Sequence, residues 1–443
     1  MKGNPTRPRL SVTTGGKGVV AHAGARLLCD VADEVGLTAG LSAAMAPSKC
    51  RRRGWDRGRV LVDLAVALAD GAKTISDLQT LRNQPGLFGE VASTPTAWRT
   101  LEAVDDDALD RIATARAEAR RVAWEAGADP GFYVIDIDAT LVGAHSEKEG
   151  AAPNYKHGFG FHPLMSYLDA TGEPLAGVLR PGNAGSAPAA DMIEVLDASL
   201  FQLPVDPAET EVIVRADAAG LSHDFLDTAR ERSVRFVVGH KLSADMAQAV
   251  LKVPEGRWIP AITADGSDER EGSWAAEITE VVDLSSWPVG TRAIARREEA
   301  HPGAQLSFSD VDGHRYQVFF TDLTDDVDFC EALYRGRGRA ECAIRDAKDT
   351  GLANLPSSDF GINAAWMVAG LMAGDLLAWM RALCLDGELA RAEPGRLRYA
   401  LLHTAAIIVS GARRQTLRIA EGWPWAAELV VAFSRLPGWS LVT

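Results

Sequence analysis

Cysteine is scarce in this chain, and long uncharged apolar runs are absent from it. The five cysteines among 443 residues are scattered and form no Cys-x-x-Cys pair, which argues against a zinc ribbon and a disulfide framework. We therefore expect free thiols in a reducing cytoplasm. The longest apolar stretch, residues 364–385, contains Asp375 and Arg381, so it predicts a buried helix and no membrane span.

Basic residues are also in the minority. The chain has 46 Lys and Arg against 60 Asp and Glu, a net charge of −14, which excludes an evenly basic nucleic-acid coat. The balance is uneven, because residues 1–60 hold 11 Lys and Arg against 4 Asp and Glu, whereas residues 244–330 hold 7 against 17. Such asymmetry is compatible with a nucleic-acid surface near the N-terminus.

The N-terminal part, residues 1–127, has the pattern of a helical domain. Within it, Thr94 is a favourable N-cap and Pro95 suits the first helical position, so a short helix is predicted from there. Thr96 and Arg99 would project from its first turns, as in helix-turn-helix readout of DNA. The alternative is an ordinary capped helix in a bundle. The basic N-terminus favours the DNA-binding interpretation.

The middle of the chain places carboxylates on predicted strands. Residues 132–140 are an apolar, β-branched run typical of a buried strand, and alternation puts Asp136 and Asp138 on one face. Two carboxylates on such a face are costly unless they bind a cation or are otherwise paired. Asp217 ends another buried strand, and strand ends are where active sites of open sheets lie.

The order of elements predicts an α/β fold with a mixed sheet. Residues 244–329 change character into short strands separated by turns, with runs at 276–282 and 305–308 among the predicted strands. Three of their aromatics are candidates for stacking on a base: Trp258, Trp274 and Trp287. An apolar helix is expected near residues 400–409. The predicted divisions are a helical DNA-binding domain (1–127), a catalytic core (128–243), a β-rich insertion (244–329), the rest of the core (330–385) and a C-terminal helical region (386–443).

Residues 334–348 carry the most unusual pattern. On a continuous helix with Tyr334 at zero, Arg337 falls near roughly −60°, Glu341 near −20°, Lys348 near −40° and Arg345 near +20°. One narrow face would then carry a hydroxyl, several cations and a single acid. The alternative is a solvated surface helix with ion pairs between successive turns.

Asp138, Asp217 and Glu341 together would form a carboxylate cluster. Hard oxygen ligands suit Mg²⁺ or Mn²⁺. Two such ions about 3.5–4 Å apart can activate an attacking oxygen and stabilise a leaving one in phosphodiester displacement. The remaining side chains of the helix face are then expected to hold DNA phosphates: Tyr334, Arg337, Arg345 and Lys348.

These motifs resemble a known family. The spacing Tyr334-(2)-Arg337-(3)-Glu341-(6)-Lys348 is similar to the Tyr-Arg-Glu-Lys signature of bacterial insertion-sequence transposases with a DDE catalytic triad. The triplets ending the two strands, residues 138–140 and 215–217, resemble the surroundings of that family's first and second acids. Three further phrases resemble its subgroup numbered thirteen-eighty: residues 162–164, 179–183 and 351–356.

The resemblance implies an RNase H-like catalytic core with a β-rich insertion and flanking all-α domains. It implies Mg²⁺-dependent cut-and-paste transposition, in which element ends are nicked and the freed 3′-OH attacks a target. The implied partners are terminal inverted repeats, target DNA and further copies of the chain bound to DNA. No membrane partner is expected, and the place of action would be the cytoplasm, on the nucleoid when DNA is bound.

Two other functions remain open. Residues 136–140 also fit the Asp-x-Asp-x-Thr strand of haloacid-dehalogenase-like phosphatases, with Asp136 as nucleophile and Asp138 as acid/base. Magnesium would then be held by one of three later acids: Asp322, Asp325 or Asp326. The second is a catalytically silent DNA-binding derivative of a transposase. Between Asp136 and Asp138 as first metal ligand, Asp138 is chosen because it begins an Asp-x-Thr motif.

Overall fold

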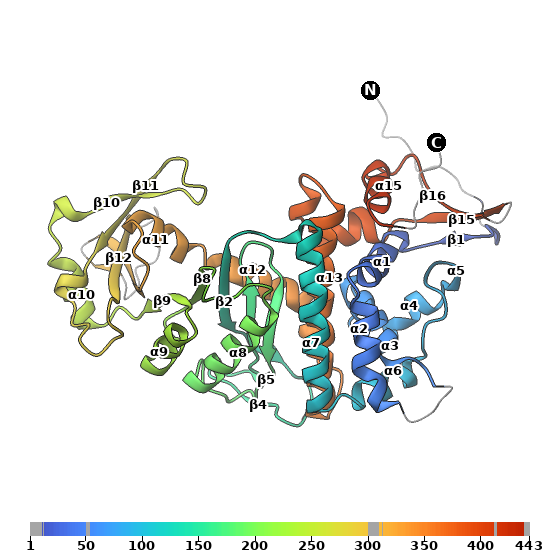
Figure 1. Ribbon diagram of the computed structural model, residues 1–443, viewed down its shortest axis with the longest axis horizontal. Helices are drawn as coiled ribbons and strands as arrows, with labels where there is room; N and C mark the ends of the chain where they lie inside the picture. Colours follow the sequence, from blue (N-terminus) through green and yellow to red (C-terminus); the bar gives the residue numbers. More distant parts are fainter. Residues whose placement is uncertain are drawn as a thin grey trace.

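The protein is described by a computed structural model covering residues 11, 13–49, 54–299, 310–311, 313–411 and 414–437. Figure 1 shows an elongated arrangement with N-terminal helices at one end, a twisted sheet in the middle and a strand-rich extension at the other end. The C-terminal segment returns to the N-terminal helices, where β1 (Val19–Val20) pairs with β15 (Ala406–Gly411). Two segments far apart in sequence are therefore joined.

The N-terminal third is helical, as predicted. Its helices are α1 (Arg26–Glu34), α2 (Leu37–Met45), α3 (Arg57–Ala69), α4 (Gln79–Arg82), α5 (Pro85–Phe88), α6 (Thr94–Glu102) and α7 (Asp106–Ala123). The apolar helix α3 is buried along almost its whole length and packs against α2 and α13. The predicted cap of α6 is displaced by one residue, because Ser93 is the N-cap and Thr94 is already helical.

The central sheet has the strand order β9-β8-β2-β6-β7. Its strands are β2 (Tyr133–Ala139), β6 (Leu164–Leu168), β7 (Pro174–Val178), β8 (Val212–Ala216) and β9 (Arg235–His240). β2, β8 and β9 run parallel, whereas β6 and β7 join as an antiparallel meander. This order and these directions are those of an RNase H-like core. The helices α8 (Ala189–Gln202) and α9 (His223–Glu231) connect and cover the parallel strands (Figure 1).

The β-rich insertion extends this same sheet. Its main strands are β10 (Ile259–Ile262), β11 (Glu269–Glu277), β12 (Arg292–Glu299) and β14 (His314–Thr321), and β14 pairs with β9. The sequence pattern placed one strand at 276–282, but the strand ends at Glu277 and a short 3₁₀ turn follows. Another predicted strand, at 305–308, lies outside the described residues.

The predicted helix over residues 334–348 is two helices. α11 (Val327–Arg335) ends before α12 (Gly338–Ala347), and the turn between them contains bonds from residue i to i−3, including Arg337 N to Tyr334 O at 3.1 Å. Gly336 approaches Arg215 so closely that an added Cβ would lie 2.6 Å from its Nη1. The assumption of one continuous helix was therefore wrong.

α13 (Phe360–Cys384) is the buried helix that its apolar sequence predicted. Among the described helices it alone is long and apolar enough to cross a membrane by length and composition, yet 67% of its most apolar window is buried inside the protein. Its Asp375 is buried against Arg116 and Arg120 of α7, at 2.7 and 2.6 Å. α13 thus joins the N-terminal helices to the sheet.

The C-terminal region is only partly helical. After α14 (Pro394–Leu397), the strand β15 pairs antiparallel with β16 (Arg414–Ile419), and α15 (Ala426–Ser434) follows. The helix expected at 400–409 was therefore wrong beyond residue 402. A short apolar run fits a strand and a buried helix equally well, and here pairing with β1 decides between them.

Candidate active site

The parallel pairing of β2 with β8 places Asp138 beside Asp217. The last paired residues are Ile137 and Ala216, so Asp138, still within β2, and Asp217, directly after β8, each come one position later at the same edge of the sheet. Both side chains are half-buried. Burial raises the pKa of Asp138, and the neighbouring charge of Asp217 raises it further, while Arg337 opposes the rise.

Asp136 lies on the same face of β2, but it is already paired. Arg215 of β8 binds it through two hydrogen bonds, Nε to Oδ1 at 2.6 Å and Nη2 to Oδ2 at 2.7 Å, and both side chains are buried. Burial raises the pKa of Asp136 to about 6, against the opposing charge of Arg215. Both of its carboxylate oxygens are therefore occupied inside the protein.

The helix α12 is fastened to the sheet by two arginines on either side of Gly338. Arg337 Nη1 lies 3.2 Å from Asp138 Oδ2, and Arg339 Nε donates to Asp169 Oδ1 at 2.7 Å. Asp169 in turn accepts from Arg215 at 2.8 Å. A chain of charged pairs therefore links β2, β8 and the start of α12.

Glu341 projects from the first turn of α12 and is exposed. Burial alone would lower the pKa of the Arg337 guanidinium, but the negative charges of Asp138, Asp217 and Glu341 help to raise it above its usual value. All three acids therefore act on Arg337. Within the described chain, the acids do not form a group whose ligand oxygens all lie within 4.8 Å of one another. An arginine cation thus stands among carboxylates that share one face.

Two other members of the signature, Tyr334 and Lys348, lie in different surroundings. Tyr334 stacks on Phe319 with ring centroids 4.6 Å apart, and its hydroxyl lies against Gly239, where an added Cβ would be 2.3 Å away. Lys348 is half-buried, and its pKa is lowered by burial and by the charge of Lys156. That Lys348 lies within reach of the charge of Lys156 was not predicted from the sequence.

Arg345 faces the surface and is engaged by acids of its own neighbourhood. Its Nη2 donates to Glu393 at 2.5 Å, and its Nε lies 3.8 Å from Asp346. The guanidinium is more than half exposed. It is therefore free to exchange an exposed acid for a phosphate, a change that involves little burial.

A model of the family described as transposase DDE domain, group 1, matches residues 3–440 of this chain. The chain belongs to this family of DDE transposases. No curated protein sequence matches it. Among solved structures, it is similar to the piggyBac transposase in a cryo-EM structure of a synaptic complex with hairpin DNA, at 10% identity and a TM-score of 0.45 over 87% of this chain and 82% of that chain. A likeness of this degree assigns no residue.

The phosphatase alternative is wrong for this transposase. Asp322 Oδ1 accepts from Phe236 N at 2.9 Å, at the beginning of β9, whereas Asp138 lies where the parallel strands end. Asp322, one of the acids expected to hold magnesium for a phosphatase, therefore lies at the opposite edge of the sheet from Asp138. Asp136, the supposed nucleophile, is held by Arg215.

The helix α6 lies far from the acids of the transposase. Figure 1 places it on the other side of α7 and α13 from β2. Arg99 is exposed, and Thr96 Oγ1 is 3.0 Å from the hydroxyl of Ser93. Trp98 beside them is 37% exposed. The structure does not join this surface to the active site, so it would contact a different part of the DNA.

The three tryptophans of the insertion are engaged within the protein. Arg297 lies over the rings of Trp258 and Trp274, 4.6 and 5.1 Å from their centroids. Trp287 stacks on His223 at 3.9 Å. Trp258 is buried, with 8% of its surface exposed, and Trp274 and Trp287 are half-buried. Stacking on a base would require these rings to leave their present partners.

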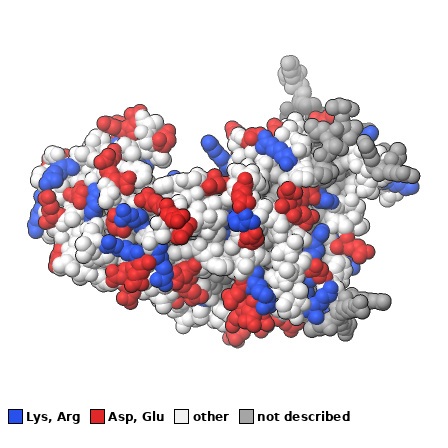
Figure 2. All heavy atoms as spheres, viewed as in Figure 1, with Lys and Arg blue, Asp and Glu red and all other residues white. Residues whose placement is uncertain are grey.

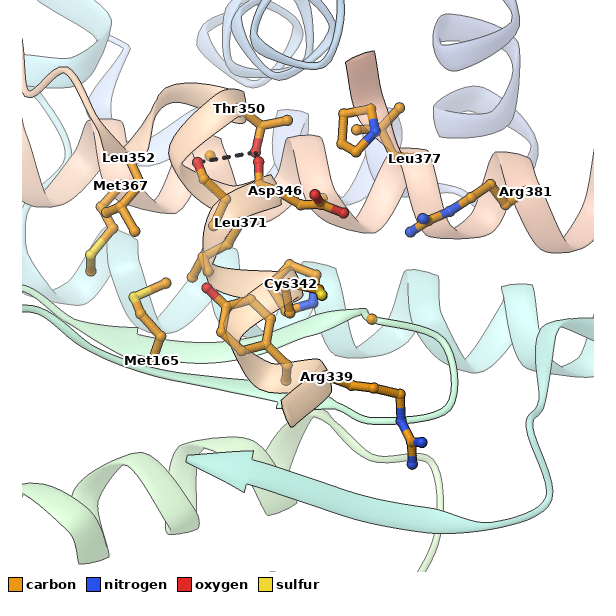
Figure 3. Close-up of a pocket in the computed structure, with 18 residues that line it drawn as sticks. Met165, Arg339, Cys342, Asp346, Thr350, Leu352, Met367, Leu371, Leu377 and Arg381 are labelled. Carbon is orange, nitrogen blue, oxygen red and sulfur yellow. Dashed lines mark hydrogen bonds between the residues drawn. The ribbon is translucent and has the colours of Figure 1, made fainter. Parts of the chain in front are cut away.

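A cavity of about 190 Å³ lies against the face of α12 that carries Arg339, Cys342 and Asp346 (Figure 3). Its wall is mostly apolar and comes from β6, α12 and α13, with Met165, Cys342 and Leu371 among the labelled residues. The lining has a few polar members, among them Arg339 and Asp346. In the described part of the chain, no group of three possible metal ligands lies there.

Proposed function

We propose that this transposase belongs to a bacterial insertion sequence of the thirteen-eighty-like subgroup. In this proposal it cuts the element at its terminal inverted repeats and joins the freed 3′-OH ends to target DNA. Support comes from the signature spacing of residues 334–348 and the three subgroup phrases. The match of a DDE transposase family model to nearly the whole chain is consistent with it.

We propose Asp138, Asp217 and Glu341 as the catalytic acids. The observation that carries this assignment is the parallel register, which puts Asp138 and Asp217 side by side while Asp136 is paired with Arg215. DDE transposases generally use divalent metal ions. The oxygen donors here fit Mg²⁺ or Mn²⁺, since burial and the neighbouring charge of Asp217 raise the pKa of the Asp138 carboxyl, and a nearby cation would relieve both effects. We expect two ions.

When bound, the ions supply activation of the attacking oxygen and neutralisation of the leaving one. Asp138 must be released from Arg337 for this purpose. Arg337 then turns its guanidinium to a DNA phosphate, which it can bind through two parallel hydrogen bonds. Lys348 and Arg345 add positive charge along the same DNA strand. Tyr334 packs against Gly239 and holds the turn at Arg337 in the DNA-free protein. When DNA binds, the Tyr334 hydroxyl donates to a phosphate.

Outside the active site, we propose that the domain of residues 1–127 binds the terminal repeats. Thr96 and Arg99 of α6 would contact DNA there. Figure 2 shows acidic and basic side chains interspersed on one face, without a continuous basic surface, so binding would use local groups. We further propose that copies of the chain assemble on paired ends, in the cytoplasm and on the nucleoid. In the assembled complex, we propose that one tryptophan of the insertion leaves its present partner and stacks on a DNA base.

A cleavage assay tests this function. The purified protein is incubated with linear DNA carrying the repeats that flank its gene, with Mg²⁺, Mn²⁺ or chelator, and product ends are mapped. We expect cuts at the element boundary only with metal, followed by joining to a target plasmid. Specific binding without cutting under every metal condition would instead indicate the silent DNA-binding derivative.

A further inference from the structure

Three side chains from distant parts of the chain meet where the N-terminal strand joins the C-terminal hairpin. They are His22, just after β1, Asp70, at the end of α3, and His403, shortly before β15. Their ligand atoms all lie within 4.8 Å of one another, the one such group among the described residues. The DDE chemistry uses none of the three.

The contacts within this cluster are close. His22 Nδ1 lies 2.6 Å from Asp70 Oδ2, and His403 Nε2 lies 2.8 Å from the main-chain oxygen of Asp70. The two imidazole rings are in contact, with centroids 4.4 Å apart. One carboxylate thus faces two imidazoles at once.

Asp70 has an oxygen without a hydrogen bond. Its side chain is only 3% exposed, and Oδ1 accepts no hydrogen bond from any described residue. That atom lies 3.3 Å from His403 Nε2. Two ligand atoms each about 2.0–2.1 Å from a tetrahedral zinc ion lie about 3.3 Å apart. A zinc ion could therefore lie between these two atoms once His403 Nε2 gives up its hydrogen bond to the main-chain oxygen of Asp70.

We propose that His22, Asp70 and His403 bind one zinc ion, with water as the fourth ligand. Two imidazoles and a carboxylate are ligands that zinc accepts, and a site with three protein ligands leaves one position open. His403 is 41% exposed, which gives the ion a path from solvent. The nearby cation Arg398 is neutralised by Asp349 at 2.6 Å.

The ion would fasten three segments that main-chain hydrogen bonds already bring together. β1 has two paired residues, Val19 with Ile407 and Val20 with Ala406, and two more bonds join Ala23 N to Thr404 O at 2.9 Å and Ile408 N to Gly18 O at 2.7 Å. His22 itself has a left-handed backbone, with φ of 56°, which directs its ring to the cluster. Figure 1 shows this junction at the end of the molecule away from the insertion. In this proposal the ion joins the three segments and takes no part in DNA cleavage.

The test uses the full chain with Asp138→Asn, Asp217→Asn and Glu341→Gln, so that the active-site acids cannot bind zinc. After dialysis against chelator, zinc is titrated calorimetrically and the bound metal is counted by mass spectrometry. We expect one zinc per chain, a dissociation constant of about 1 µM or lower, and a melting temperature raised by several degrees. Co²⁺ in place of zinc should give the visible absorption of a tetrahedral site.

Two variants in that background separate ligation from folding. His403→Gln keeps a donor for the main-chain oxygen of Asp70 but lacks the imidazole, so it should weaken zinc binding at least tenfold and abolish the thermal shift. His145→Ala removes an exposed histidine outside the cluster and should change neither. Zinc binding that is absent, or that survives His403→Gln unchanged, would overturn the proposal and leave a hydrogen-bonded cluster only.

Discussion

At the residue scale, two aspartates on one face of β2 differ because of what stands beside each. Asp136 faces Arg215, whose guanidinium binds both of its oxygens, whereas Asp138 faces Asp217. The sequence could show that both acids needed a partner. It could not show that Arg215, two residues before Asp217, is the partner of Asp136 and not of Asp138, since that depends on the register between distant strands.

Arg337 is expected to compete with metal for Asp138. Its pair with Asp138, at 3.2 Å and partly exposed, is worth about 1 kcal/mol, so Arg337→Gln should raise the Mn²⁺ affinity of the DNA-free protein about fivefold. DNA cleavage should fall, because a phosphate contact is lost. Manganese binding is followed by electron paramagnetic resonance. Arg345→Gln is the control, and an unchanged or weaker affinity in Arg337→Gln would contradict the competition.

The buried Asp63 in α3 provides a pH-dependent prediction. Burial raises its pKa to about 6, although Arg59 opposes the rise. Between pH 4 and 6 the folded protein therefore keeps a proton that the unfolded chain has released, so its stability falls as pH rises through that window. Asp63→Asn cannot titrate and should gain about 1–3 kcal/mol over the wild type at pH 8 relative to pH 4.

Melting temperatures of the two proteins at both pH values test this expectation. Arg59 is 37% exposed at its side chain, so it can turn to solvent when its partner is neutral. An equal difference between variant and wild type at pH 4 and pH 8 would show that the carboxyl does not titrate in this window.

At the element scale, the strands of the core were predictable and the break in the signature helix was not. The run at 132–140 became β2 at Tyr133–Ala139, and the strand ending in Asp217 became Val212–Ala216. Both are apolar and β-branched, so pattern and burial agree. The break at Gly336 depends instead on the buried Arg215 behind it, a contact across more than a hundred residues. The hairpin β15–β16 was also missed, because β15 pairs with β1 from the other end of the chain.

Two glycines on either side of Arg337 allow a matched test of that turn. In Gly336→Ala the new Cβ would meet Arg215 Nη1 at 2.6 Å and Leu333 O at 3.1 Å, so stability should fall by about 1–3 kcal/mol and cleavage should fall with it. In Gly338→Ala nothing lies within 4 Å of the added atom. That variant should be as stable as the wild type or slightly more so. Thermal unfolding and cleavage of both variants decide; equal behaviour would contradict the packing described here.

At the scale of the whole molecule, DNA binding by an acidic protein has to come from local basic groups. If Arg99 of α6 contacts a phosphate, Arg99→Ala should weaken binding to the repeats and reduce the slope of log affinity against log salt by about one. Fluorescence anisotropy over a salt series measures this. Arg232→Ala is the control, because that exposed arginine of the core is paired with Asp197 at 2.9 Å. Equal slopes for all three proteins would exclude Arg99 from the DNA surface.

The central claim is that one acid on α12 completes the active site with two acids from the sheet. Glu341→Gln keeps the size and exposure of the side chain and removes its charge. In the metal-dependent cleavage assay on terminal-repeat DNA, we expect this variant to lose cutting by at least about a thousandfold, while its affinity for the same DNA stays within about threefold of the wild type. Glu388→Gln, which lies outside α12, should cut normally. Cutting by Glu341→Gln at the wild-type rate would contradict the assignment of Glu341 as the third catalytic acid.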